Sequence, residues 1–429
     1  MKDALTGLDR YEVFLEKLQK ELDQIGDDEI VIIYTDIKHF KYINDTYGYK
    51  VGDSLLKEFV AEFTKNNDVL IGASRVYSDN FVTANRICAD SYTHNEFCDI
   101  IKRLNHDWET KFREKYLNSR LQFCTGISFV NKKSRSLDAE TAVSNANLAR
   151  KVAKEMEDSC CVLFDQSMME GIKREVEITS CIPKALADRE FKIFFQPKIE
   201  TDTMSLMGAE ALLRWQKPDG SLIYPDEFIP FIERSGQIVE VDYYVYREVF
   251  RFLAERIKNG KRVVPISLNV SRIHLNQMHI LEYVEKLFEE YQIPHSMVEF
   301  ELTESIYLDN TERVLELIRG LHKIGTKVSL DDFGSGYSSL NLLSKLPIDI
   351  IKLDKVFLSE GNLQESDKVI ISCVVDMAKK LQITSLCEGV ETVEQSNYLK
   401  EVGCQVQQGF YFSRPIPQEV FEKFIDESL

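Results

Sequence analysis

The stretch Lys327–Leu340 reads KVSLDDFGSGYSSL, and it contains the pattern that decides the fold of the larger part of the chain. Lys327–Leu330 is a short apolar segment, and the adjacent carboxylates Asp331 and Asp332 follow it directly. Polar groups at the end of a buried strand are costly unless they are paired or bind a ligand. The pattern therefore predicts a strand that delivers two carboxylates to a site.

Seven further short apolar segments in the second half of the sequence resemble this one, and stretches with helical periodicity lie between most of them. Eight strands that alternate with helices over about 250 residues are typical of a (β/α)8 barrel. Including the segment above, they are Ile193–Ile199, Ala209–Trp215, Pro265–Val270, Val298–Thr303, Lys327–Leu330, Ile348–Leu353, Thr384–Cys387 and Val406–Phe412.

The spacing of polar residues near the ends of these segments supports the barrel and predicts one irregularity. Asn269 and Glu301 are 32 residues apart, and Glu301 and Asp331 are 30 apart, which fits one strand–helix unit each. Gln196 and Glu210 are only 14 residues apart, too short for a crossover helix. We therefore expect the first two strands to form an antiparallel hairpin.

Because the carboxyl ends of barrel strands converge on one face, these polar residues should share one mouth. Carboxylate and amide oxygens suit Mg²⁺ or Mn²⁺, and two such ions about 3.5–4 Å apart are the usual clamp for attack on a phosphodiester. A lysine among them can orient or help deprotonate a water. A salt bridge or a capped strand end would explain any one of these residues, but not the whole set: Gln196, Glu210, Asn269, Glu301, Asp331, Asp332, Lys352, Glu388 and Gln408.

The motifs around these positions resemble those of the EAL-domain phosphodiesterases, over about residues 178–427. The resemblance implies hydrolysis of cyclic di-GMP to linear pGpG with two Mg²⁺ or Mn²⁺ ions. The motifs are Glu210–Trp215 (EALLRW), Leu268–Ser271 (LNVS), Glu301–Glu304 (ELTE), Asp331–Leu340 (DDFGSGYSSL), Ile351–Asp354 (IKLD), Glu388–Thr392 (EGVET) and Gln408–Gly409.

The resemblance also assigns roles to individual residues. Glu210, Asn269, Glu301 and Asp331 would hold one metal ion, and Asp331, Asp332 and Glu388 the other. Lys352 would contact the nucleophilic water, and Glu304 would brace the Asp332–Ser338 loop. Arg214 and Gln196 would contact the substrate, with Gln408 completing the mouth. No catalytic position departs from the family pattern.

The first part of the chain resembles the GGDEF domain of diguanylate cyclases, which implies an α+β fold. The resemblance rests on Asp3–Leu8 (DALTGL), Thr35–Asp45 (TDIKHFKYIND), Val51–Leu56 (VGDSLL) and Asn147–Glu155 (NLARKVAKE). By the same resemblance, Asp36 would hold one metal ion, and Asn44 and Asp53 would read a guanine.

The motif that names this family departs from its pattern. At the predicted hairpin the chain reads Tyr77-Ser-Asp-Asn-Phe81, so side chains replace the glycines that let the backbone approach nucleotide phosphates. Asn80 cannot supply the second negative charge that helps to hold the metals, and Lys38 stands where the family has an aspartate. We therefore expect no cyclase activity and a structural or regulatory domain, with GTP sensing as a weaker alternative.

The sequence thus predicts an α/β protein with two domains: residues 1–170, a degenerate GGDEF-like (nucleotide-cyclase-like) domain, and residues 171–429, a modified (β/α)8 barrel of EAL type. Two other hypotheses remain open. One is a non-catalytic cyclic di-GMP receptor or interaction module, and the other is a diguanylate cyclase or bifunctional enzyme. The resemblance also implies a homodimer through the barrels.

Composition limits the partners. The 429 residues carry 53 Lys and Arg against 70 Asp and Glu, a net charge of −17, which disfavours binding of nucleic-acid polymers. Divalent cations in the mouth would reverse the local field for a dianionic dinucleotide. No apolar run approaches the roughly 20 residues of a bilayer span, so we expect no membrane insertion and a cytoplasmic protein, or the cytoplasmic part of a longer sensor.

Overall fold

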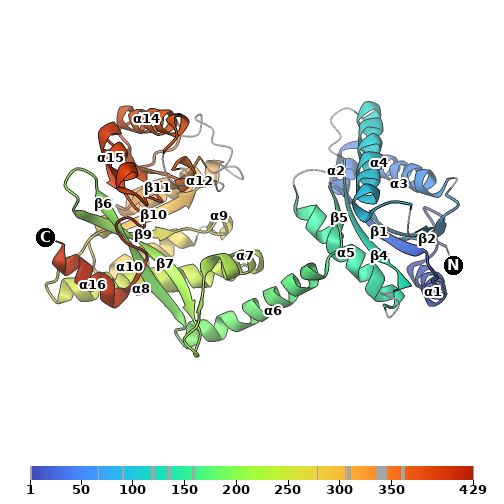
Figure 1. Cartoon of the computed structure of the whole chain (residues 1–429), viewed down its shortest axis with the longest axis horizontal. Coiled ribbons are helices and arrows are strands. Elements are labelled where there is room, and N and C mark those ends of the chain that lie inside the picture. Colours follow the sequence, from blue (N-terminus) through green and yellow to red (C-terminus); the bar gives the residue numbers. More distant parts are fainter. Residues whose placement is uncertain are drawn as a thin grey trace. The chain divides into compact units, whose positions relative to one another are not determined.

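The computed structural model describes residues 2–65, 67–88, 91–116, 121–132, 137–156, 160–277, 279–304, 306, 311–334, 345–358 and 363–428. The chain divides into two compact units, a first unit of residues 1–173 and a second unit of residues 174–429 (Figure 1). Helix α6 (Gln166–Ala187) runs across this division. Among the described residues, no helix combines the length and the apolar character that crossing a membrane requires.

The first unit is built on a five-stranded sheet with the order β2-β3-β1-β4-β5. Its central strand β1 pairs antiparallel with both β3 and β4, and β5 lies parallel to β4. As predicted, β2 and β3 form a hairpin around the degenerate motif. The strands are β1 (Glu29–Lys38), β2 (Leu70–Tyr77), β3 (Asn80–Ile87), β4 (Gln122–Val130) and β5 (Cys160–Leu163).

Helices cover both faces of this sheet because β1 is apolar on both. Ile30, Ile32 and Tyr34 pack in a core with α1 and α5, whereas Ile37 packs in a second core with α2, α3 and α4. The helices are α1 (Tyr11–Asp23), α2 (Phe40–Tyr47), α3 (Tyr49–Thr64), α4 (His94–Lys115) and α5 (Ala139–Glu155).

The second unit contains a closed barrel. Strands β6, β7, β9, β10, β11, β12, β13 and β14 form a ring, because β6 pairs with both β7 and β14. Strand β6 is antiparallel to both neighbours, and the other pairs around the ring are parallel. This arrangement confirms the predicted barrel and its antiparallel start.

The ring strands and short edge strands have well-defined limits. They are β6 (Phe191–Glu200), β7 (Leu206–Gln216), β8 (Leu222–Ile223), β9 (Ile266–Asn269), β10 (Val298–Thr303), β11 (Lys327–Phe333), β12 (Ile350–Leu353), β13 (Thr384–Cys387), β14 (Val406–Gln407) and β15 (Ile416–Pro417).

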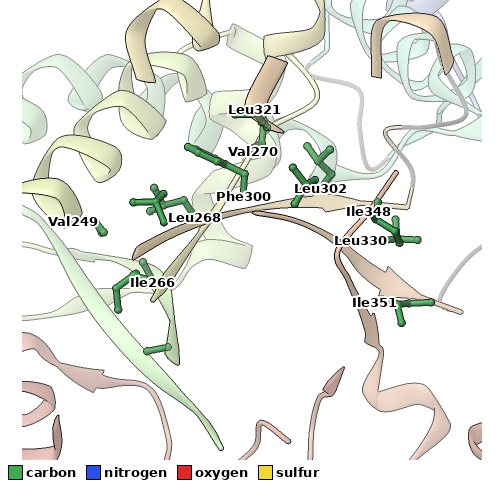
Figure 2. Close-up of a cluster of buried hydrophobic side chains, with 14 of the residues drawn as sticks. Val249, Ile266, Leu268, Val270, Phe300, Leu302, Leu321, Leu330, Ile348 and Ile351 are labelled. Carbon is green, nitrogen blue, oxygen red and sulfur yellow. The ribbon is translucent and has the colours of Figure 1, made fainter. Parts of the chain in front are cut away.

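Residues alternate along these strands between an apolar core shared with the helices and the interior of the ring, which is polar towards the mouth. Figure 2 shows Ile266 and Leu268 of β9 near Phe300 and Leu302 of β10 in that core. The intervening positions of β10 carry Glu299 and Glu301. Because side chains alternate with a period of two, the residues that anchor the strands against the helices also aim the polar residues inward.

The helices around the ring supply the other half of this core. They are α7 (Pro225–Ser235), α8 (Ile238–Lys258), α9 (His274–Gln277), α10 (Ile280–Tyr291), α12 (Thr311–Ile324), α14 (Glu365–Lys380), α15 (Val393–Val402) and α16 (Gln418–Glu427), with 3-10 turns η2 (His295–Met297) and η3 (Lys355–Phe357).

Candidate active site at the barrel mouth

Lys352 of β12 lies at the centre of a cluster of carboxylates. Its Nζ is 2.6 Å from Glu301 Oε2, 2.7 Å from Glu388 Oε1 and 2.9 Å from Asp331 Oδ1. A fourth carboxylate oxygen, Oε2 of Glu210, lies at 3.6 Å. The lysine side chain is completely buried. The strand ends therefore bring together four of the predicted metal ligands and the predicted lysine.

The charges in this cluster perturb one another strongly. Burial alone would lower the pKa of Lys352, but the surrounding carboxylates raise it well above its ordinary value. Burial raises the pKa of Glu210, and it raises the pKa of Glu388 well above its usual range; neighbouring carboxylates add to both effects. Lys352 is therefore an ammonium group that forms ion pairs with these carboxylates.

Asp331 and Asp332 are held by backbone contacts around the end of β11. The Asp332 amide donates to Asp331 Oδ1 at 2.9 Å, and Asp332 adopts a left-handed backbone with φ of 56°. Burial, with the nearby charge of Asp331, raises the pKa of Asp332 to about 6. Oε2 of Glu304 accepts from the Gly334 amide at 3.2 Å, at the start of the predicted loop. Beyond Gly334, residues 335–344 lie outside the described residues.

Two amide side chains donate to the Glu210 carboxylate, and a third amide side chain, that of Gln196, contacts one of them. Nε2 of Gln408 donates to Glu210 Oε2 at 2.7 Å and to Gln196 Oε1 at 3.2 Å. Nδ2 of Asn269 donates to Glu210 Oε1 at 3.1 Å. Both carboxylate oxygens are thus fixed by neutral donors. The oxygen of the Gln408 side-chain amide, Oε1, is buried and has no hydrogen-bond partner among the described residues.

A cavity of about 490 Å³ opens beside Asn269 at the same end of the barrel. Its lining includes Leu213 of β7, Ser271 after β9 and Thr303 of β10. Cavities of about 300–1,000 Å³ are typical of small-molecule sites. The next residue after Leu213, the predicted substrate ligand Arg214, lies with its guanidinium 5.4 Å from the centre of the Tyr224 ring.

Two charged residues beneath this cluster, Lys198 and Glu299, are not among the predicted site residues. Lys198 of β6 places its Nζ 2.8 Å from Glu301 Oε1 and 3.1 Å from Glu299 Oε1. Together with Lys352, it lowers the pKa of Glu301 to about 2, against the effect of burial. The sequence pattern that could have indicated them is the two-residue alternation of side chains along a strand. It places Lys198 on the same strand face as Gln196, and Glu299 on the same face as Glu301.

The donor set fits divalent cations of the kind that prefer oxygen ligands. One carboxylate oxygen from each of Glu210, Glu301 and Asp331 lies within 4.8 Å of the others, and the same holds for Asp331, Asp332 and Glu388. Lys198 and Lys352 are the two ammonium groups in contact with five carboxylates here. Burial, together with this excess of negative charge, raises the pKa of Glu210 and of Glu388. Additional cations would neutralise the excess charge.

The corresponding site of the first unit has a different balance of charge. Asp36 is almost completely buried, and its carboxylate forms ion pairs at 2.9 Å with Arg150 and with Lys154 of α5. At the hairpin, Ser78 takes a left-handed φ of 48°, and Oδ1 of Asn80 is buried without a hydrogen-bond partner among the described residues. Two side-chain cations thus occupy the carboxylate to which the resemblance assigned a metal ion.

Each of the two units matches a known protein family. Residues 180–415 match the family model of the EAL domain, and residues 1–159 match that of the diguanylate cyclase GGDEF domain. The chain belongs to the EAL-domain family, with a GGDEF domain ahead of its EAL domain.

Individual relatives resemble most of the chain. It is 29% identical over 425 residues to the cyclic di-GMP phosphodiesterase PdeR of Escherichia coli K12, covering 98% of this chain and 63% of PdeR. It is also 29% identical to the bifunctional diguanylate cyclase/cyclic di-GMP phosphodiesterase MucR of Pseudomonas aeruginosa, covering 98% of this chain and 61% of MucR. The chain therefore spans less than two-thirds of the length of either relative.

Two solved structures resemble the second unit. The PaMucR phosphodiesterase in complex with c-di-GMP is 31% identical and has a TM-score of 0.54, with 57% of this chain and 99% of that chain covered. An EAL-domain protein from Listeria monocytogenes EGD-e is 28% identical and has a TM-score of 0.51, covering 58% and 97% of the two chains.

Proposed function

We propose that the barrel hydrolyses cyclic di-GMP to linear pGpG with two divalent cations, Mg²⁺ or Mn²⁺, held at its mouth. The observation that carries this proposal is the cluster around Lys352, in which every predicted carboxylate ligand lies near a second one. By the chemistry of the donors, Glu210, Asn269, Glu301 and Asp331 would hold one cation, and Asp331, Asp332 and Glu388 the other. Such a pair supplies charge stabilisation for attack on the phosphodiester.

The remaining groups position the reactants. The Lys352 ammonium donates a hydrogen bond to the attacking water and so orients its oxygen towards phosphorus. That oxygen forms the new bond to phosphorus and gives up one proton to the solvent. The bond between phosphorus and the ribose 3′ oxygen breaks, and the 3′ oxygen takes up one proton from the solvent. Arg214 and Gln196 contact the substrate, and Gln408 keeps Glu210 in place. Glu304 supports the start of the loop that follows Asp332 through its hydrogen bond with Gly334.

We further propose that the first unit makes no cyclic di-GMP. Formation of the product from GTP would require metal ions beside Asp36, where Arg150 and Lys154 already supply two positive charges. A structural or regulatory role remains for this unit, and binding of GTP without turnover is compatible with it.

Turnover of cyclic di-GMP by the purified chain with Mg²⁺ or Mn²⁺ tests the main proposal. We expect pGpG from the parent protein and a loss of at least a hundredfold in Glu210→Gln, which keeps the shape of the side chain but removes its charge. An exposed control, Glu365→Gln on α14, should retain full activity. Binding of cyclic di-GMP without hydrolysis under every metal condition would instead identify a receptor, and cyclic di-GMP made from GTP would refute the proposal for the first unit.

A further inference from the structure

Lys198 is a buried charge that the proposed reaction does not use. It lies on β6, two residues beyond Gln196, and only 5% of its surface is exposed. In the antiparallel register, Gln196 is opposite Glu210 and Lys198 is opposite Gly208. Because β6 runs against the other strands, Lys198 lies deeper in the ring than Gln196 and approaches the carboxylate cluster from below.

The contacts of Glu301 are divided between two lysines. Its Oε1 lies 2.8 Å from Lys198 Nζ, and its Oε2 lies 2.6 Å from Lys352 Nζ. The Glu301 side chain is fully buried. A carboxylate held at one oxygen from below presents the other oxygen upward, towards Asp331 and Glu210.

Lys198 also contacts Glu299, which lies on the same face of β10 as Glu301. Two acidic side chains at adjacent inward positions would repel each other in this buried setting. A purely structural role for Lys198 would consist of neutralising this pair. A positioning role would depend on the contact with Glu301 alone, and the two roles can be separated by experiment.

We propose that Lys198 is a positioning residue that fixes Glu301 Oε1 at the floor of the barrel and so directs Oε2 into the cation site. The inference rests on the proposed function, because it assumes that Glu301 is a metal ligand. Groups that orient metal ligands typically change metal affinity by 10–100-fold when they are removed. Lys198 acts through Glu301 and has no contact with substrate in this account.

The variant that separates the two roles is the double substitution Lys198→Met/Glu299→Gln. It removes one positive and one negative charge together, so the net buried charge is unchanged, but Glu301 Oε1 loses its ion pair with Lys198. The single variant Glu299→Gln is the matched control, because it keeps the ion pair between Lys198 and Glu301 and removes only the charge of Glu299.

The experiment uses the full chain, freed of metal by chelation and titrated with Mn²⁺ alone in a calorimeter. Thermal unfolding of each metal-free variant serves as the measure of folding. We expect the double variant to unfold within a few degrees of the parent and to bind Mn²⁺ at least tenfold more weakly, with the KM for cyclic di-GMP unchanged. We expect Glu299→Gln to bind Mn²⁺ within about threefold of the parent.

Mn²⁺ affinity within threefold of the parent in the folded double variant would overturn the inference and leave Lys198 a structural role. If the double variant loses its unfolding transition, Lys198→Gln/Glu299→Gln takes its place, with the same expected weakening, because a neutral amide does not replace an ammonium group. If the parent protein hydrolyses cyclic di-GMP but the double variant binds Mn²⁺ as tightly as the parent, only the inference is refuted. A parent that binds no Mn²⁺ would refute both the inference and the proposed function.

Discussion

Replacement of Lys352 by Met should destabilise the metal-free barrel severely. The ammonium group is completely buried and contacts four carboxylates at 2.6–3.6 Å. Removing one partner of a buried ion pair costs about 3–5 kcal/mol, because the other partner keeps an uncompensated charge. For a unit of roughly 250 residues, 1 kcal/mol corresponds to about 2–4 °C, so we expect Tm to fall by about 6–20 °C.

The same charge argument predicts that a divalent cation restores part of this loss. Mn²⁺ at about a hundredfold over its dissociation constant stabilises a protein by about 2.7 kcal/mol, which corresponds to about 5–11 °C for this unit. The measurement is calorimetric unfolding of the parent and of Lys352→Met, each with chelator and with excess Mn²⁺. Lys352→Met should gain more from Mn²⁺ than the parent does, because the parent already has an ammonium group among its carboxylates.

Lys380→Met provides the matched control. Its ammonium also forms an ion pair, 2.7 Å from Asp376, but the lysine side chain is 74% exposed. Exposed pairs contribute about 0–1 kcal/mol, so this variant should unfold within about 4 °C of the parent. A chelated Lys352→Met protein that unfolds within 2 °C of the parent would refute the reasoning, since it would mean that the carboxylates do not depend on the ammonium group.

Three further predictions concern other parts of the structure. Arg150→Met should destabilise the first unit by about 3 kcal/mol, because buried Asp36 loses a guanidinium at 2.9 Å; an unchanged unfolding curve in denaturant would contradict this. Gly126→Ala should cost about 3 kcal/mol or more, because the new Cβ would lie 2.0 Å from a backbone carbonyl oxygen of α5, and soluble protein with the parent's Tm would show that α5 moves freely. Gln408→Leu removes the 2.7 Å donor to Glu210, so the Mn²⁺ concentration for half-maximal hydrolysis should rise about tenfold; an unchanged value would exclude Gln408 from positioning this ligand.

The barrel was predictable because each strand carries two independent signals. An apolar segment marks the strand, and a polar residue near its end marks the mouth. The hairpin at the start followed from distance along the chain, since the separation of 14 positions from Gln196 to Glu210 leaves no room for a crossover helix. Such arguments need no knowledge of the pairing register, which is why they succeed on the sequence alone.

Elements that bury little apolar surface were harder to predict. Helix α4 has 22 residues, of which only Cys98, Glu109 and Phe112 are buried, so its apolar stripe is too sparse to see. Asp3–Leu8 lies ahead of helix α1, which begins at Tyr11. There the Asp3 carboxylate accepts from the Thr6 amide at 2.7 Å and Gly7 has a φ of 71°, so local hydrogen bonds favour a turn.

The ion pairs beneath the mouth could not be found from spacing. Lys198 and Glu301 are 103 residues apart, and their contact depends on the register between β6 and the rest of the ring. Sequence alternation shows only that Lys198 points to the same side as Gln196. Which carboxylate it contacts depends on ring closure, because β6 joins the ring through β7 and β14 and stands three strands from β10 in the order β6-β7-β9-β10.

Lys352 and a divalent cation would compete for the same carboxylate oxygens. This competition couples the electrostatic stability of the site to its activity. In the absence of other cations, the Lys352 ammonium is the group that forms ion pairs with Glu388, Asp331 and Glu210 among the described residues. Under the proposed function, cations bound by those carboxylates would weaken its attraction to them and repel it. A lysine released from some of its ion pairs in this way would have N–H groups free for a water molecule. The Lys352 that stabilises the metal-free barrel would then also orient the water in the metal-loaded barrel, so the stability and the activity of this barrel should respond to the same substitution for one electrostatic reason.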